Sequence, residues 1–89
     1  MQIYQGAVAY HLTTLGDGVD AVDRALLEAG MTFTRTPVTV VWPGGRAEGV
    51  EFVFVLGPRD QRAGLDLVTR LRATSKWLQV RKVDASTPS

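Results

Sequence analysis

The chain has 89 residues, of which 45% are hydrophobic and 21% charged, a balance that suits one small globular domain and excludes extensive disorder. Ten Lys and Arg against nine Asp and Glu give a formal net charge of +1, which argues against a strongly basic nucleic-acid module. Cysteine is absent, so disulfides, thiol catalysis and cysteine-ligated metal sites are excluded.

The sequence contains no sign of membrane insertion or export. No apolar run reaches the ~18 residues that a membrane span needs. The first residues carry no basic segment ahead of an apolar one, as a secretory signal would. We therefore expect a cytoplasmic protein, with a single domain over residues 1–84 and a flexible tail over residues 85–89.

The first half of the chain predicts a strand, a helix and a second strand. Residues 2–12 show no helical stripe and are rich in β-compatible types, which favours a strand. Asp17 can cap a helix that begins near Gly18, and Gly30 can end it. The apolar stripe of this helix consists of Val19, Val22, Leu26 and Ala29. A threonine- and valine-rich strand follows over residues 31–42.

The second half predicts another strand, helix and strand. Pro43-Gly44-Gly45 indicates a tight turn. The most hydrophobic segment, residues 47–56, predicts a strand, and a helix follows from Asp60 to about Thr74. Residues 77–83 predict a last short strand. The helical residues expected to face inward are Gly64, Leu67, Val68 and Leu71.

The element order βαββαβ predicts an α+β, ferredoxin-like fold. Four antiparallel strands then lie in the order 4-1-3-2, with both helices on one face of the sheet. Pro37 falls inside the second predicted strand and cannot donate a ladder hydrogen bond. The expected strand order places this strand at an edge of the sheet, where a proline is tolerated.

Side-chain alternation predicts that the sheet has a second, partly apolar face. In the third predicted strand Phe52 and Phe54 point one way, toward the helices, and their neighbours point the other way. A two-layer fold leaves that second face in water, and an exposed apolar face is typical of an association site. We therefore expect a homo-oligomer, a homodimer in the simplest case, that forms through the sheet. The predicted interface residues are Glu51, Val53, Val55 and Trp42.

A small-molecule effector site is predicted near the first loop. Backbone amides ahead of a helix can bind an anion, although the same residues suit an ordinary turn and cap. His11, the only histidine, lies at the predicted end of the first strand, just before this loop. It can bind a ligand or accept a phosphoryl group, or it can be an ordinary surface residue. The predicted ligand-binding residues are Gly16, Asp17, Gly18 and His11.

The sequence favours a non-enzymatic protein. Serine occurs only at Ser75, Ser86 and Ser89, which leaves no convincing Ser/His/Asp triad. Asp17, Asp20 and Asp23 have spacing that suits helix capping better than metal ligation. We therefore expect no catalytic residues, no bound metal and no cofactor.

Positive charge is concentrated in the last third of the chain. This region can serve an interaction module that binds an acidic protein partner or a nucleic acid, or it can be a solvated surface. The basic residues concerned are Arg62, Arg70, Arg72, Lys76, Arg81 and Lys82. The near-zero net charge argues against the nucleic acid.

Between residues 3 and 83 the pattern resembles that of ACT-like regulatory domains. The resemblance is carried by a strand and a glycine loop, a helix that ends in LLEAGMTF, a helix with LDLVTRL and a closing VRKV strand. In that family a glycine of the first loop lets a small ligand approach at a dimer interface, and Gly18 occupies that place. The resemblance implies a non-enzymatic module that binds a small ligand and self-associates.

A second resemblance implies a different function. GAVAYH is similar to the G-x-A-x-P-H phosphohistidine motif of sugar-phosphotransferase IIA domains, and GVEFVFVLGP resembles one of their later strands. It implies a truncated phosphocarrier that uses His11. Tyr10 stands in place of the motif's proline, Gly64 falls near the family's second histidine, and the N-terminal half of that domain is missing.

Overall fold

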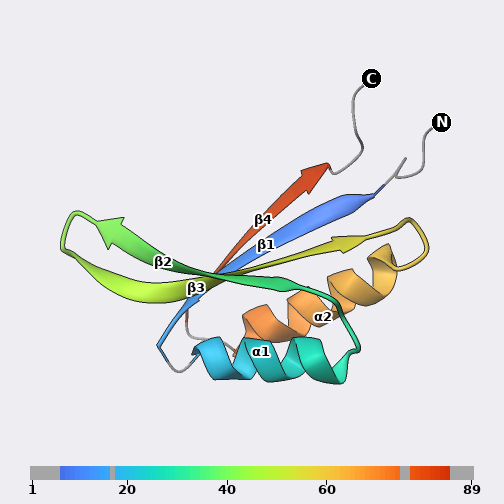
Figure 1. Ribbon diagram of the computed structural model, residues 1–89, viewed down its shortest axis with the longest axis horizontal. Helices are drawn as coiled ribbons and strands as arrows, with labels where there is room; N and C mark the ends of the chain where they lie inside the picture. Colours follow the sequence, from blue (N-terminus) through green and yellow to red (C-terminus); the bar gives the residue numbers. More distant parts are fainter. Residues whose placement is uncertain (1–6, 17, 75–76, 85–89) are drawn as a thin grey trace.

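The computed structural model describes residues 7–16, 18–74 and 77–84. Its elements, in chain order, are β1 (Val8–Leu15), α1 (Gly18–Glu28), β2 (Thr34–Trp42), β3 (Gly45–Leu56), α2 (Gln61–Thr74) and β4 (Leu78–Asp84). The strands form one antiparallel sheet in the order β2-β3-β1-β4, and both helices cover the same face of it (Figure 1). The predicted ferredoxin-like fold and strand order are confirmed.

The first strand differs from its prediction. β1 continues to Leu15 instead of ending at residue 12. The β-branched residues Thr13 and Thr14 extend it in register with β3 and β4. His11 therefore lies in the middle of a strand, and the prediction that it ends one was wrong. The predicted strand residues 2–6, the Asp17 cap, Lys76 and the predicted tail over residues 85–89 lie outside the described residues.

Gly30 ends α1, as predicted. Its φ angle of 72° is in the left-handed region that favours glycine. The N–H of Gly30 donates to the carbonyl of Leu27 (3.0 Å), and the N–H of Met31 donates to the carbonyl of Leu26 (3.1 Å). These two bonds form a Schellman motif. Because the motif uses Gly30 and Met31, β2 begins at Thr34 and not at residue 31 as predicted.

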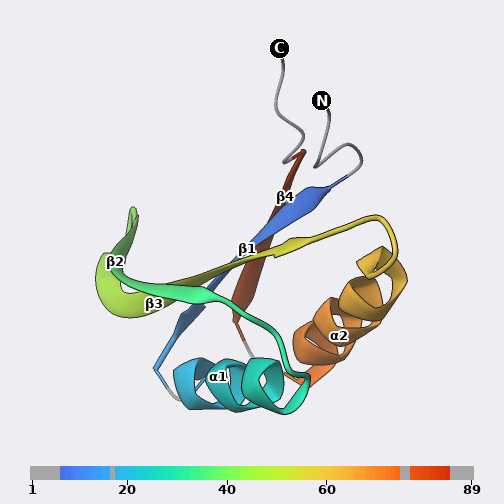
Figure 2. The ribbon, with the colours of Figure 1, turned by 45° about the vertical axis from the view of Figure 1, so that its right-hand side comes forward.

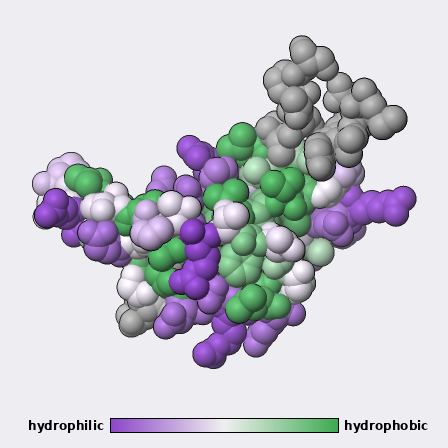
Figure 3. Space-filling view, viewed as in Figure 1, coloured by the Kyte–Doolittle hydropathy of each residue, from purple (hydrophilic) through white to green (hydrophobic). Residues whose placement is uncertain are grey.

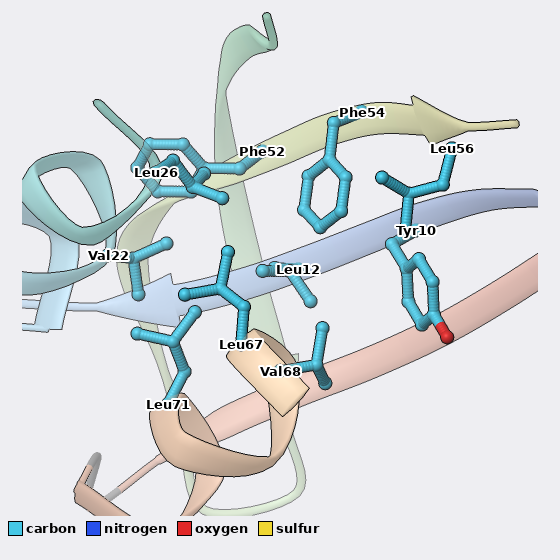
Figure 4. Close-up of a cluster of buried hydrophobic side chains, with 10 residues drawn as sticks. All are labelled: Tyr10, Leu12, Val22, Leu26, Phe52, Phe54, Leu56, Leu67, Val68 and Leu71. Atoms are coloured by element: carbon cyan, nitrogen blue, oxygen red, sulfur yellow. The ribbon is translucent and has the colours of Figure 1, made fainter. Parts of the chain in front are cut away.

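The hydrophobic core lies between the sheet and the helices. Its ten buried side chains, drawn in Figure 4, are Tyr10, Leu12, Val22, Leu26, Phe52, Phe54, Leu56, Leu67, Val68 and Leu71. The rings of Tyr10 and Phe54 stack with centroids 5.6 Å apart. All four predicted inward residues of α2 are buried. Of the predicted α1 stripe, Ala29 is exposed, because the helix ends at Glu28 before it.

The β2–β3 hairpin projects beyond the rest of the sheet. β1 pairs with β3 only between Leu56 and Gly49, so residues 39–42 and 45–48 pair only with each other. We call these residues and the turn between them the hairpin arm, and Figures 1 and 2 show it extending from the body. β2 is an edge strand, which confirms the expectation drawn from Pro37. No helix in the described parts of the chain is long and apolar enough to cross a membrane.

Candidate functional site

The candidate site is the sheet face turned away from the helices, which we call the open face. Tyr10, Leu12, Phe52 and Phe54 point into the core, so the residues that alternate with them point outward. The strand register extends this assignment to the neighbouring strands, and Arg81 and Val53 are both partners of His11. The open face therefore combines side chains from all four strands.

Much of the open face is apolar and uncovered. The exposed fractions are 55% for Val55, 46% for Trp42 and 41% for Val83. Val38 and Val40 of β2 and Val53 of β3 lie on the same face by register and are half-buried. In Figure 3 the hairpin arm carries isolated apolar groups among hydrophilic ones. The four residues predicted as an interface, Glu51, Val53, Val55 and Trp42, all lie on this face.

A polar cluster of three side chains interrupts the apolar surface of the open face. His11 Nδ1 lies 3.4 Å from Nη2 of Arg81 and 3.7 Å from Oε2 of Glu51. The His11 and Glu51 side chains are 21% and 29% exposed. With Thr13 and Gln79, the three residues line a hollow of about 140 Å³. We call His11, Glu51 and Arg81 the polar cluster.

The protonation state and the tautomer of His11 together decide which neighbour its Nδ1 binds. A neutral ring whose Nδ1 carries no proton accepts a hydrogen bond from Arg81, whereas a protonated ring donates from Nδ1 toward Glu51. The cluster holds an acid and a base, so its two permanent charges cancel. The described residues contain no group of three or more His, Asp or Glu side chains able to hold a metal ion.

The glycine loop has a structural role that needs no ligand. Gly16 has a φ angle of 54° at the turn between β1 and α1, and its carbonyl accepts a hydrogen bond from Val19 N–H (3.1 Å). Gly18 packs so closely on Thr14 that a Cβ atom there would overlap Thr14 Oγ1. Thr14 is fully buried, and its hydroxyl donates to the carbonyl of Trp77 (3.2 Å).

The structure does not bring all the predicted ligand-binding residues together. His11 points to the open face, whereas Gly18 packs against Thr14 on the helix side. Gly16 follows His11 by five residues of extended chain, about 16 Å at a rise of about 3.3 Å per residue. Gly16 and Gly18 lie together at the start of α1, and Asp17 between them is outside the described residues.

His11 and Gly64, which falls near the second histidine of the phosphotransferase family, lie on opposite sides of the sheet. His11 is on the open face, and Gly64 of α2 is buried against Leu56 on the helix side. A second phosphate-steadying group from position 64 therefore has no access to His11. The basic residues are divided in the same way, because Arg62, Arg70 and Arg72 belong to α2 and Arg81 belongs to the open face.

Two features were not predicted from the sequence. Arg81 is 70 residues from His11, and only the β1–β4 register could have paired them. A cleft of about 460 Å³ also lies between the α1–β2 connection, the end of β3 and α2. Met31, Leu56 and Leu67 supply apolar walls to this cleft, and Asp60 and Arg70 supply exposed opposite charges.

Comparison with known proteins yields structural similarity alone. No family model and no curated protein matches the sequence. A DUF3240 family protein from Shewanella baltica is similar in structure, with a TM-score of 0.75, 14% identity, and coverage of 94% of each chain.

Two further solved structures are similar to this chain. Arabidopsis thaliana PII bound to citrate has a TM-score of 0.70 and 13% identity, over 91% of this chain and 78% of that one. CutA from Synechococcus elongatus, complexed with a Bis-Tris molecule, has a TM-score of 0.67 and 17% identity, over 100% of this chain and 90% of that one. At such low identities the structural similarity establishes the ferredoxin-like fold alone, and the finer resemblance to ACT-like domains stays a prediction.

Proposed function

We propose that this chain is a non-enzymatic regulatory module that binds a small ligand and self-associates through the open face of its sheet. The observation that supports it most is the contrast between the two faces. Phe52 and Phe54 on the helix side are almost fully buried, whereas Val55 and Trp42 on the open face are about half exposed. An uncovered apolar face of this kind is typical of a protein interface.

The size of the open face suits a second copy of the chain. With a rise of about 3.3 Å per residue and about 4.8 Å between strands, the four strands present roughly 570 Å². Two copies packed face to face would bury roughly 1,100 Å² in total, just above the ~1,000 Å² expected of a specific interface. The face carries both an acid and a base, so a two-fold arrangement can set the acid of one copy against the base of the other.

The hairpin arm supports the same proposal. It consists of two strands with no third strand beside them, and Trp42 on its open-face side is 46% exposed. An isolated two-stranded hairpin is marginally stable in water. A second copy packed on the open face of the arm would bury Trp42 and stabilise the hairpin.

For the small ligand we propose the cleft between the α1–β2 connection and α2. Its volume of about 460 Å³ is within the range of small-molecule sites. The apolar walls and the opposite charges of Asp60 and Arg70 suit an elongated molecule with charged ends. Two proteins of similar fold, PII and CutA, have been solved with citrate and Bis-Tris, which supports a small ligand without identifying it. The glycine loop at Gly16 and Gly18 is the alternative site.

Sedimentation velocity over micromolar to millimolar concentrations tests the self-association. We expect the mass to rise from that of one chain to a multiple of it, and a single-chain mass at every concentration would contradict the proposal. Thermal unfolding with citrate and with small zwitterions tests ligand binding separately, since a ligand that binds only the folded state raises the unfolding temperature. If a ligand raises the unfolding temperature of Arg70→Gln as much as that of the unaltered chain, its binding site lies outside the cleft.

A further inference from the structure

We propose that protonation of His11 controls the self-association, so that copies of the chain associate when His11 is neutral and separate when it is charged. This inference rests on the proposed function, because it assumes that a second copy covers the open face. It assigns a regulatory role to His11 of the polar cluster, whereas the proposed function uses only the opposite charges of Glu51 and Arg81.

His11 faces one charged group on each strand beside it. Glu51 lies on β3 and Arg81 on β4, and Nδ1 of His11 is within 3.7 Å of both side chains. The other polar neighbours in the hollow, Thr13 and Gln79, are uncharged. On the described strands, the register places no other charged residue on the open face. The charge of this face therefore depends on His11 alone over the range in which carboxylates stay ionised.

Protonation changes both the charge and the hydrogen bonding of the cluster. With neutral His11, the charges of Glu51 and Arg81 cancel, and Arg81 can donate to Nδ1. With protonated His11, the cluster carries one net positive charge, and Nδ1 becomes a donor that faces another donor on Arg81. Arg81 must then move away from the ring while His11 turns its proton toward Glu51.

Protonation of His11 costs little free energy in a free chain and much more in an associated pair. On the free chain water solvates and screens the added charge. Under a second copy the cluster loses that water, and a buried charge without a full partner is costly. In a two-fold arrangement the same charge would also appear on the opposite copy, and juxtaposed like charges oppose association. Association therefore favours neutral His11 and weakens as the pH falls.

Histidine is the side chain whose charge ordinarily changes between pH 5 and 8, and this chain contains a single histidine. The test measures the dissociation constant of self-association by sedimentation at about pH 7.5 and about pH 5.5, at one ionic strength. For the unaltered chain we expect association to be ten- to a hundredfold weaker at the lower pH. Circular dichroism at both pH values confirms that the chain stays folded.

The matched variant is His11→Gln, which keeps a hydrogen-bonding side chain but cannot gain a charge. We expect this variant to associate at both pH values with dissociation constants that agree within about threefold. Equal association of the unaltered chain at both pH values would overturn the inference and leave the proposed function standing. Equal pH dependence of the two proteins would also overturn it, because another group would then be responsible. A single-chain mass at about pH 7.5 and millimolar concentration would instead overturn the proposed function itself.

Discussion

Gly64 of α2 packs directly against Leu56 of β3, so closely that a Cβ atom at residue 64 would overlap Cδ1 of Leu56. Leu56 is part of the buried core cluster, so moving its side chain to make room disturbs core packing, although one side of it borders the cleft. We expect Gly64→Ala to destabilise the fold, because overpacking costs typically ~1–3 kcal/mol, while the better helix propensity of alanine returns only about 1 kcal/mol. Thermal unfolding would then show a midpoint several degrees lower.

Gly57→Ala is the control for this variant. A Cβ atom at Gly57 would meet nothing within 4 Å, and its φ angle is outside the left-handed region. We expect no loss of stability, and a gain of up to about 1 kcal/mol through the reduced entropy of the unfolded chain. Equal unfolding midpoints for the two variants would show that the close packing of Gly64 on Leu56 does not affect stability.

Thr14→Val tests the buried hydroxyl that links β1 to Trp77, the residue before β4. The substitution keeps the shape of the side chain but removes the donor to the Trp77 carbonyl. We expect the free energy of unfolding to fall by about 1–2 kcal/mol, since a part-buried carbonyl then loses its partner. The control is Thr13→Val, one residue earlier and on the open face, which should change the free energy of unfolding by less than about 0.5 kcal/mol. Urea denaturation of both variants measures the difference, and equal values would contradict a role for this hydrogen bond.

Val55→Glu tests the open face as an association surface. Val55 is 55% exposed, so we expect a charge there to leave the fold intact and to weaken self-association at least tenfold. Leu65→Glu is a matched control, because Leu65 is 54% exposed but lies on α2, away from the open face. Sedimentation of the two variants distinguishes the surfaces. Dissociation caused by Leu65→Glu alone would place the interface on the helices.

The ion pair between Asp23 of α1 and Arg35 of β2 should contribute little. The two groups are 3.4 Å apart, but the Arg35 side chain is 49% exposed. We expect Asp23→Asn to lower the free energy of unfolding by no more than about 1 kcal/mol, and by less in high salt. Arg35→Ala should cost more, because the guanidinium also lies over the Phe52 ring, 5.6 Å from its centroid. Chemical denaturation of both variants at low and at high salt measures the two losses in the free energy of unfolding.

Local patterns were enough to predict the fold. Side-chain alternation in β3 separated Phe52 and Phe54 from Glu51 and Val53, and helical spacing identified Leu67 and Leu71 as buried. Gly30 indicated the end of α1, and Pro37 indicated an edge strand. These features act over one turn or one strand, because backbone geometry and side-chain direction are set by near neighbours.

The element order, the two faces of the sheet and the buried side of α2 thus follow from patterns within the chain. Only the folded arrangement shows that His11 lies in mid-strand between Glu51 and Arg81, and that Gly64 lies behind the sheet from it. These positions depend on strand register, because a shift of one residue between two strands turns every side chain of the shifted strand to the other face. Contacts across 40 or 70 residues depend on that register, and it is fixed only when the whole core packs.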